Sequence, residues 1–137
     1  MCKIALQRIV SLGLFFSLLP GMIAARDKSV SKNFIVEPPT LISLGFEWHI
    51  DGDDNRNAEV SAQYRKSGEQ AWKEGLPLLR LQREQTYSGA FHYTAPNMFA
   101  GSIFDLEAGT EYECRFVLVD PDGIEGKSEN LVTVRTR

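Results

Sequence analysis

Apolar and polar residues alternate with a period of two through much of the chain after residue 33. The clearest case is residues 41–50, in which one parity is formed by Ile42, Leu44, Phe46, Trp48 and Ile50. A period of two places successive side chains on opposite faces of a strand, so this segment predicts a strand with one buried face. We expect its tryptophan, the largest apolar group available, to lie in the core.

The same pattern predicts six further strands. They are expected at residues 34–37, 58–64, 72–81 with a bend at Pro77, 98–106 with a bulge near Asp105, 112–118 and 131–136. Residues 82–97 lack a clear period and are expected to form a long loop with at most one short strand. Helical periodicity of useful length is not seen after residue 25. Seven short alternating strands predict an all-β, two-sheet antiparallel sandwich.

Residues 106–118 predict a corner that leads into the central strand of this sandwich. Gly109 supplies a turn, after which Tyr112, Cys114, Phe116 and Leu118 share the inward parity. A tyrosine that enters such a strand can hydrogen-bond backbone across the corner, as in the tyrosine corner of immunoglobulin-like sandwiches. We therefore expect Trp48, Tyr64, Tyr112 and Phe116 to be buried together.

The first 25 of the 137 residues have the composition of a signal peptide. Lys3 and Arg8 form a basic start, residues 9–19 are almost wholly apolar, and Ala24 and Ala25 provide a small-residue cleavage region. The alternative is a membrane anchor, but the apolar run is shorter than the roughly 20 residues that a spanning helix needs. We expect a secreted or periplasmic protein with a flexible leader at residues 26–33 and a domain at residues 34–137.

Charge and cysteine content limit the partners of the exported chain. Removal of residues 1–25 takes away two cationic side chains and no acidic ones, which changes the net charge from −3 to −5. A net negative domain without a basic face is not expected to bind nucleic acid or anionic membranes. Cys114 is then the only cysteine, so no intrachain disulfide can form, and its inward parity predicts a small core side chain.

Several sequence strings resemble known modules. The tryptophan strand, VSAQYRKSGEQAW, the LEAGTEYECRF corner and the closing VTVRT together resemble a fibronectin type III domain over residues 34–136. GFEWHIDGDDNRNA, AWKEGLPLLRL and NMFAGSIFDLEAGTEYECRF look like the N-terminal module of secreted bacterial right-handed parallel β-helix proteins. The resemblance implies an immunoglobulin-like fold and a role beside a carbohydrate-active domain. The chemistry of the β-helix is not implied for this module.

An acidic connection at residues 51–57 contains candidate calcium ligands. Asp51, Asp53 and Asn55 have the 1,3,5 spacing of a calcium loop, but Arg56 and Ala62 occupy the positions where an EF-hand has glycine and glutamate. A looser site shared with the 120–125 connection stays open, because both connections should emerge at one end of the sandwich. The alternative is a pair of hydrated loops without an ion, and no cofactor is expected.

Aromatic residues outside the core pattern provide a second candidate site. These residues are Trp72, Tyr87, Phe91 and Tyr93. On one exposed face they could stack on sugar rings, and otherwise they would cover an open end of the sandwich or contact another domain. His49 and His92 are the only histidines, and no nucleophile motif accompanies them. We therefore expect a non-catalytic accessory module that spaces or supports a neighbouring domain or mediates protein interaction; the alternative is an autonomous carbohydrate-binding module.

Overall fold

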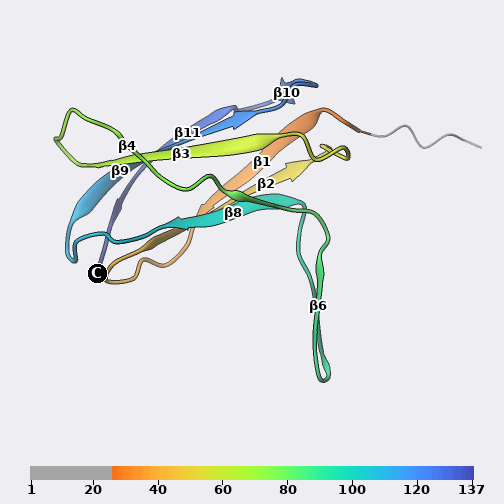
Figure 1. The fold of residues 1–137 in the computed structure, drawn as a ribbon, viewed down its shortest axis with the longest axis horizontal. Helices are drawn as coiled ribbons and strands as arrows, with labels where there is room; N and C mark the ends of the chain where they lie inside the picture. Colours follow the sequence, from red (N-terminus) through yellow and green to blue (C-terminus); the bar gives the residue numbers. More distant parts are fainter. Residues whose placement is uncertain (1–25) are drawn as a thin grey trace, which may run out of the picture.

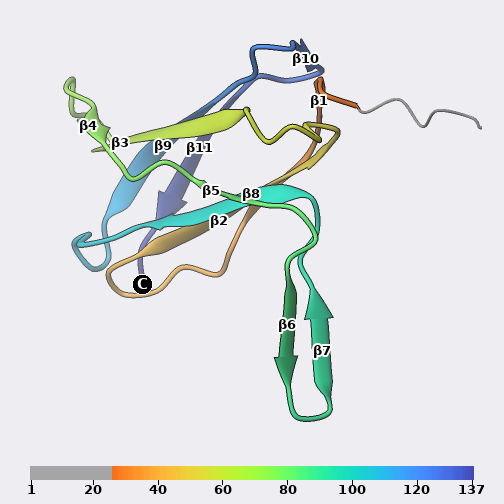
Figure 2. The ribbon, with the colours of Figure 1, turned by 45° about the vertical axis from the view of Figure 1, so that its right-hand side comes forward.

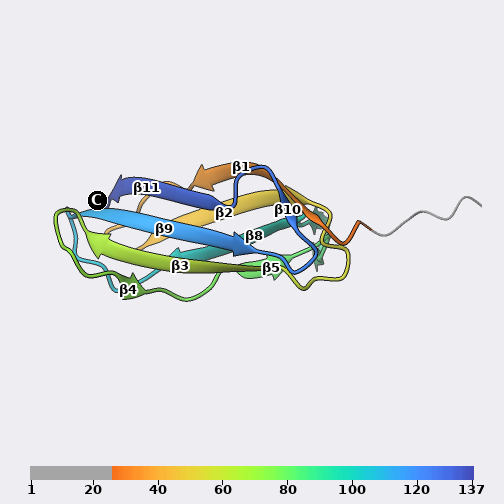
Figure 3. The ribbon, with the colours of Figure 1, turned by 90° about the horizontal axis from the view of Figure 1, so that it is seen from above.

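The computed structural model describes residues 26–137, which form two β-sheets packed face to face and a separate hairpin (Figures 1 and 3). The expected signal peptide, residues 1–25, lies outside the described residues. The prediction of a flexible leader at residues 26–33 is wrong from Ser29 onward, because strand β1 begins at that residue. Ser29 is fully buried and its backbone N–H donates to the Asp120 carboxylate at 2.8 Å, which fixes the start of the strand.

The first sheet has the order β10-β1-β2-β8-β5. Its strands are β10 (Ile124–Glu125), β1 (Ser29–Val36), β2 (Leu44–Asp51), β8 (Met98–Ile103) and β5 (Leu79–Leu81). The second sheet has the order β11-β9-β3-β4, formed by β11 (Glu129–Arg135), β9 (Glu111–Val119), β3 (Glu59–Lys66) and β4 (Lys73–Glu74). All neighbours are antiparallel except β1 and β10, which are parallel.

The core lies between these two sheets and follows the predicted alternation. Trp48 and Phe116 are fully buried, and the rings of Phe46 and Phe116 meet across the sheets with centroids 4.5 Å apart. Trp48 also donates its indole N–H to Ser31 Oγ at 3.0 Å, so its one polar atom is satisfied. Tyr64 is only partly buried at the edge of the cluster. The predicted core is thus confirmed for Trp48, Tyr112 and Phe116 and is wrong in part for Tyr64.

The corner before β9 has the predicted geometry. The Tyr112 hydroxyl accepts a hydrogen bond from the backbone N–H of Glu107 at 2.9 Å, and its ring is 3% exposed. Gly109 has φ of +60°, a conformation that glycine adopts without steric cost. Along β9, Tyr112, Cys114, Phe116 and Leu118 are all buried, which confirms the predicted register.

Two strand limits differ from the prediction. Ile42 is 58% exposed, because residues 40–43 form a turn in which Thr40 Oγ1 accepts the N–H of Ser43 and β2 begins only at Leu44. Strand β8 ends at Ile103, and Asp105 follows with φ of +58°. A left-handed residue after the strand, rather than a bulge within it, therefore turns Leu106 into the core.

The strand expected at residues 72–81 is divided between the two sheets. Strand β4 pairs with β3, whereas β5 pairs with β8 on the opposite sheet. Pro77 lies between them and cannot donate a ladder hydrogen bond, which favours a break at this point. Leu78 is buried and bridges to Val60, but Leu76 and Leu79 are 68% and 66% exposed.

The loop expected at residues 82–97 is instead a β-hairpin that projects away from the sandwich (Figure 2). It consists of β6 (Gln85–Ser88) and β7 (Phe91–Thr94), paired in register from Gln85↔Thr94 to Ser88↔Phe91. The connecting loop is Gly89-Ala90, in which Gly89 has φ of +58°. Glycine at the first position of a two-residue loop is typical of a type II′ hairpin turn.

The described ends of the chain lie at opposite ends of the sandwich (Figures 1 and 3). Residue 26 lies against the connection between β2 and β3. Arg137 lies at the other end, where its backbone N–H donates to Thr40 O at 2.9 Å and its carbonyl accepts from Gly109 N at 2.9 Å. These two ends have different chemistry, and each carries a candidate site.

Candidate functional site

The hairpin carries three of the four predicted stacking residues. Tyr87, Phe91 and Tyr93 are 63%, 62% and 47% exposed, so the structure places them in solvent. Residues 85–94 contain no Lys, Arg, Asp or Glu. An isolated two-stranded hairpin is marginally stable in water, so this element is suited to gain stability from contact with a ligand or another protein.

The three aromatic side chains do not form one flat platform. Tyr87 is paired with His92, and their rings meet edge to face with centroids 5.0 Å apart. Phe91 and Tyr93 belong to the next pairs along the ladder, which project from the opposite face. The hairpin thus presents aromatic groups on both faces, and an occupant could contact either face or close around both.

Trp72, the fourth predicted stacking residue, lies elsewhere. It directly precedes β4, which is at the far side of the sandwich from the hairpin in both ribbon views (Figures 1 and 2). The guanidinium of Arg65 lies over its ring at 4.3 Å from the centroid, a cation–π contact that occupies one face of the ring. Trp72 therefore does not share one platform with Tyr87, Phe91 and Tyr93.

The three calcium candidates contact three different partners. The Asp51 carboxylate lies 3.0 Å from Lys32 Nζ, and the Asn55 amide donates to the Asp122 carboxylate at 2.7 Å. Asp53 is fully buried. Within residues 26–137, no three acidic, histidine or cysteine side chains are grouped so that they could hold a metal ion.

Asp53 organises the connection between β2 and β3. One carboxylate oxygen accepts the backbone N–H groups of Asn57 and Ala58 at 2.9 and 3.1 Å, and the other accepts Arg80 Nε at 2.5 Å. Its φ of +50° is left-handed, which aspartate tolerates better than most residues. This role of Asp53 could not be predicted from the sequence, because Arg80 lies 27 positions away and the pairing depends on tertiary structure.

The two acidic connections do emerge at the same end, as predicted. Asn55 and Asn57 both donate to the Asp122 carboxylate, at 2.7 and 2.8 Å, and so tie the 51–57 and 120–125 connections together. These donors stabilise the ionised form and lower the pKa of Asp122. The loops are therefore joined by direct hydrogen bonds between side chains.

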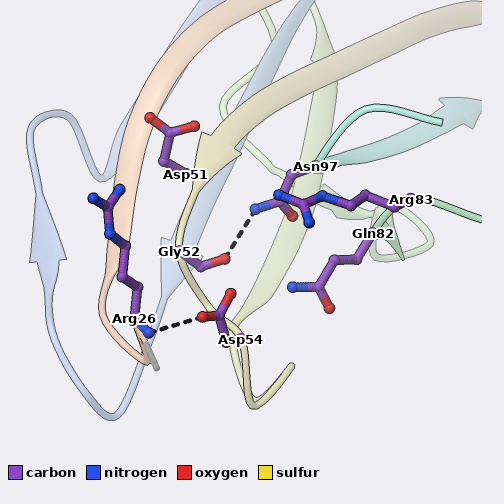
Figure 4. A pocket seen from close by; sticks show the side chains of 7 residues that line it. All are labelled: Arg26, Asp51, Gly52, Asp54, Gln82, Arg83 and Asn97. Carbon is purple, nitrogen blue, oxygen red and sulfur yellow. Dashed lines mark hydrogen bonds between the residues drawn. The ribbon is translucent and has the colours of Figure 1, made fainter. Parts of the chain in front are cut away.

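A polar cleft of about 600 Å³ lies between this end of β2 and the base of the hairpin (Figure 4). It is lined by Arg26, Asp51, Gly52, Asp54, Gln82, Arg83 and Asn97. The Asn97 amide donates to Gly52 O at 2.9 Å, and the Arg26 backbone N–H donates to Asp54 Oδ2 at 2.8 Å. The cleft thus joins the start of the described chain, the acidic connection and the hairpin.

The end of the sandwich near Arg137 is apolar by contrast. Leu41, Ile42 and Phe104 are 61%, 58% and 56% exposed there, and Leu44↔Ile103 pairing places residues 42 and 104 at the same sheet end. A groove of about 470 Å³ is lined by Pro38, Pro39, Thr40, Leu41, Ile42 and Arg137. This surface was not predicted from the sequence, because the alternation of residues 41–50 places Ile42 on the core face.

Cys114 and the two histidines each contact or pack against neighbouring parts of the fold. Burial raises the pKa of the Cys114 thiol to about 12, so it stays protonated at neutral pH. His49 lies 3.1 Å from the Glu47 carboxylate on the same strand, and His92 contacts Tyr87 on the hairpin.

Within the part of the chain that the structure describes, no helix is long and apolar enough to span a membrane.

A scan against protein-family models and a search of curated proteins found no match to this chain.

Proposed function

We propose that this chain is a non-catalytic, exported accessory module that docks its Arg137 end against a neighbouring carbohydrate-active β-helix domain. The supporting observation is the apolar groove beside Arg137, with Leu41 and Ile42 more than half exposed. Exposed apolar groups gathered in one place favour a contact surface, because their burial against a partner is favourable. Pro38 and Pro39 restrict the backbone of this surface, which lowers the entropy lost on docking.

The position of Arg137 fits this role. Its two backbone hydrogen bonds, to Thr40 and Gly109, hold residue 137 against the groove. The backbone of residue 137 therefore lies beside the exposed apolar groups that form the proposed docking surface. The module would then act as a rigid spacer, with its hairpin end directed away from the neighbour.

A fibronectin type III-like fold is part of the proposal. The order β1-β2-β8-β5 over β11-β9-β3 corresponds to the ABED and GFC sheets of immunoglobulin-like sandwiches, with β4 as an added edge strand. The hydrogen bond from Glu107 N–H to the Tyr112 hydroxyl supports the same assignment. Hairpin β6–β7 lies between the D-like and E-like strands and is an insertion into that plan.

Site-directed photo-crosslinking in the native host tests the docking surface. A photoreactive residue at Ile42 should crosslink to one β-helix domain, whereas the same residue at Leu131 should not. Leu131 is the matched control, because it is 60% exposed against 58% for Ile42 but lies on strand β11. Crosslinking that is equal at both positions, or absent at Ile42, would refute the proposal.

Carbohydrate binding by the hairpin is the second candidate function. The exposed Tyr87, Phe91 and Tyr93 on an uncharged element favour it, since aromatic rings stack on the apolar faces of sugars. Titration against a panel of polysaccharides should then show saturable binding that Tyr87→Ala or Phe91→Ala abolishes. Trp72→Ala is the control and should leave binding unchanged, because Trp72 lies beside β4, away from the hairpin. Absence of saturable binding to every polysaccharide would exclude this candidate.

A further inference from the structure

The connection after β2 holds the backbone of residues 26–28 in a fixed position. Arg26 N–H donates to Asp54 Oδ2 at 2.8 Å (Figure 4), and Asp54 N–H donates back to Arg26 O at 3.1 Å. Gly52 has φ of +80°, and a Cβ atom there would lie 2.1 Å from Lys28 O. The close approach of residue 52 to the Lys28 carbonyl therefore requires glycine. This packing places the Arg26 nitrogen directly against the Asp54 carboxylate.

Of the charged groups around the Arg26 backbone nitrogen, the Asp54 carboxylate is the nearest anion and is hydrogen-bonded to it. Asp51 is engaged by Lys32 at 3.0 Å, and Lys28 lies 3.4 Å from Glu125. The other charged groups that line the cleft are the Arg26 and Arg83 guanidinium groups. Among residues 26–137, the Arg26 amide is the only hydrogen-bond donor to the Asp54 carboxylate. The amide is a neutral donor, so among residues 26–137 this exposed carboxylate has no cationic partner.

We propose that the peptide bond between Ala25 and Arg26 is hydrolysed on export and that Asp54 binds the α-ammonium group so formed. This inference rests on the proposed export of the chain. A signal peptidase would catalyse the step, with water as the co-reactant. The water oxygen bonds to the Ala25 carbonyl carbon as the C–N bond breaks, one proton goes to the Arg26 nitrogen, and the new carboxylic acid ionises and supplies the second. Residue 26 then carries a positively charged α-ammonium group at the position from which its amide N–H donates to Asp54.

The new ion pair makes stability depend on N-terminal processing. A free α-amino group has an ordinary pKa of about 7.7–8.0, so it is largely protonated at neutral pH. Asp54 stabilises the charged form and raises the pKa in the folded protein. A raised folded pKa contributes stability that is complete below the unfolded pKa and is lost as the pH rises through the folded pKa. The effect should therefore disappear once the pH lies well above the folded pKa of the α-amine.

N-terminal sequencing and intact mass of the exported protein provide the first test. A chain that begins at Arg26 is the expected result. An exported chain that begins at any other residue would overturn this inference and leave export intact, whereas a chain that is never exported would also overturn the proposed function.

The second test measures the ion pair itself in the purified exported protein. Selective transamination of its α-amine to a carbonyl should lower the folding equilibrium constant at pH 7 by about two- to five-fold, the range of exposed ion pairs. Asp54→Asn should remove this difference, whereas the control Asp51→Asn, in the same cleft, should preserve it. A difference that survives Asp54→Asn, or a folded α-amino pKa no higher than about 7.7 by NMR, would overturn the inference.

Discussion

Replacement of Asp53 by asparagine would distinguish a structural carboxylate from a calcium ligand. Asp53 is fully buried, and its two oxygens accept two backbone N–H groups and Arg80 Nε. Asparagine can keep the acceptor for the backbone groups, but its amide nitrogen would then face the Arg80 donor. The side chain of Arg80 is only 11% exposed, so its charge would lose its partner in a poorly hydrated position.

The expected loss of stability is about 3–5 kcal/mol, the cost of removing one partner from a buried ion pair. Urea unfolding followed by the fluorescence of buried Trp48 measures this loss. With an m-value of about 1.5 kcal/mol/M, the midpoint should fall by about 2–3 M. A double-mutant cycle with Arg80→Met should show coupling of at least about 2 kcal/mol, since the two side chains act as one unit.

Asp51→Asn is the matched control for this experiment. Asp51 belongs to the same connection, but its ion pair with Lys32 leaves the two side chains 55% and 47% exposed. Such pairs contribute little, so the control should lose less than about 1 kcal/mol. An equally small loss for Asp53→Asn would refute the structural role. A wild-type melting temperature that rises with millimolar calcium, and does not rise in Asp53→Asn, would identify a calcium ligand instead.

Three further predictions concern single groups. Tyr112→Phe should lose about 1–2 kcal/mol of unfolding free energy, because it leaves the Glu107 N–H without its acceptor. A loss below about 0.3 kcal/mol, measured by urea unfolding, would contradict a stabilising corner. Asn55→Ala should bring the pKa of Asp122 closer to its ordinary value, as measured by NMR. Because this pKa is lowered in the folded protein, the ionised Asp122 carboxylate stabilises the fold above its unfolded pKa. That stabilisation is lost as the pH falls through the folded pKa. Cys114 should resist alkylation at pH 8 until the protein unfolds, and labelling faster than unfolding would contradict its burial.

The alternation of the sequence determined the sandwich core. A period of two assigns each side chain to one face, so Trp48, Phe116 and their neighbours could be placed before any contact was known. The corner at Tyr112 was also predictable, because its turn glycine and its hydroxyl lie within a few residues of the group that they contact. Local geometry was sufficient for these features.

The hairpin was missed although a local signal for it was present. Ser88-Gly89-Ala90-Phe91 has glycine at the first position of a two-residue loop, which is typical of a type II′ turn. Strand β6 lacks the apolar–polar alternation that marks a half-buried sheet, β7 is only four residues long, and every residue of both strands is exposed. Hydrophobic periodicity reports burial, so a strand without a buried face escapes it.

The candidate sites were decided by tertiary structure. Asp53 was selected for its spacing to Asp51 and Asn55, but its partner Arg80 and the partner of Asn55 come from distant segments. Ile42 has core parity, yet a turn held by Thr40 places it in solvent. Composition shows which groups are present, whereas their partners, and hence their chemistry, depend on which loops the sheets bring to the same end.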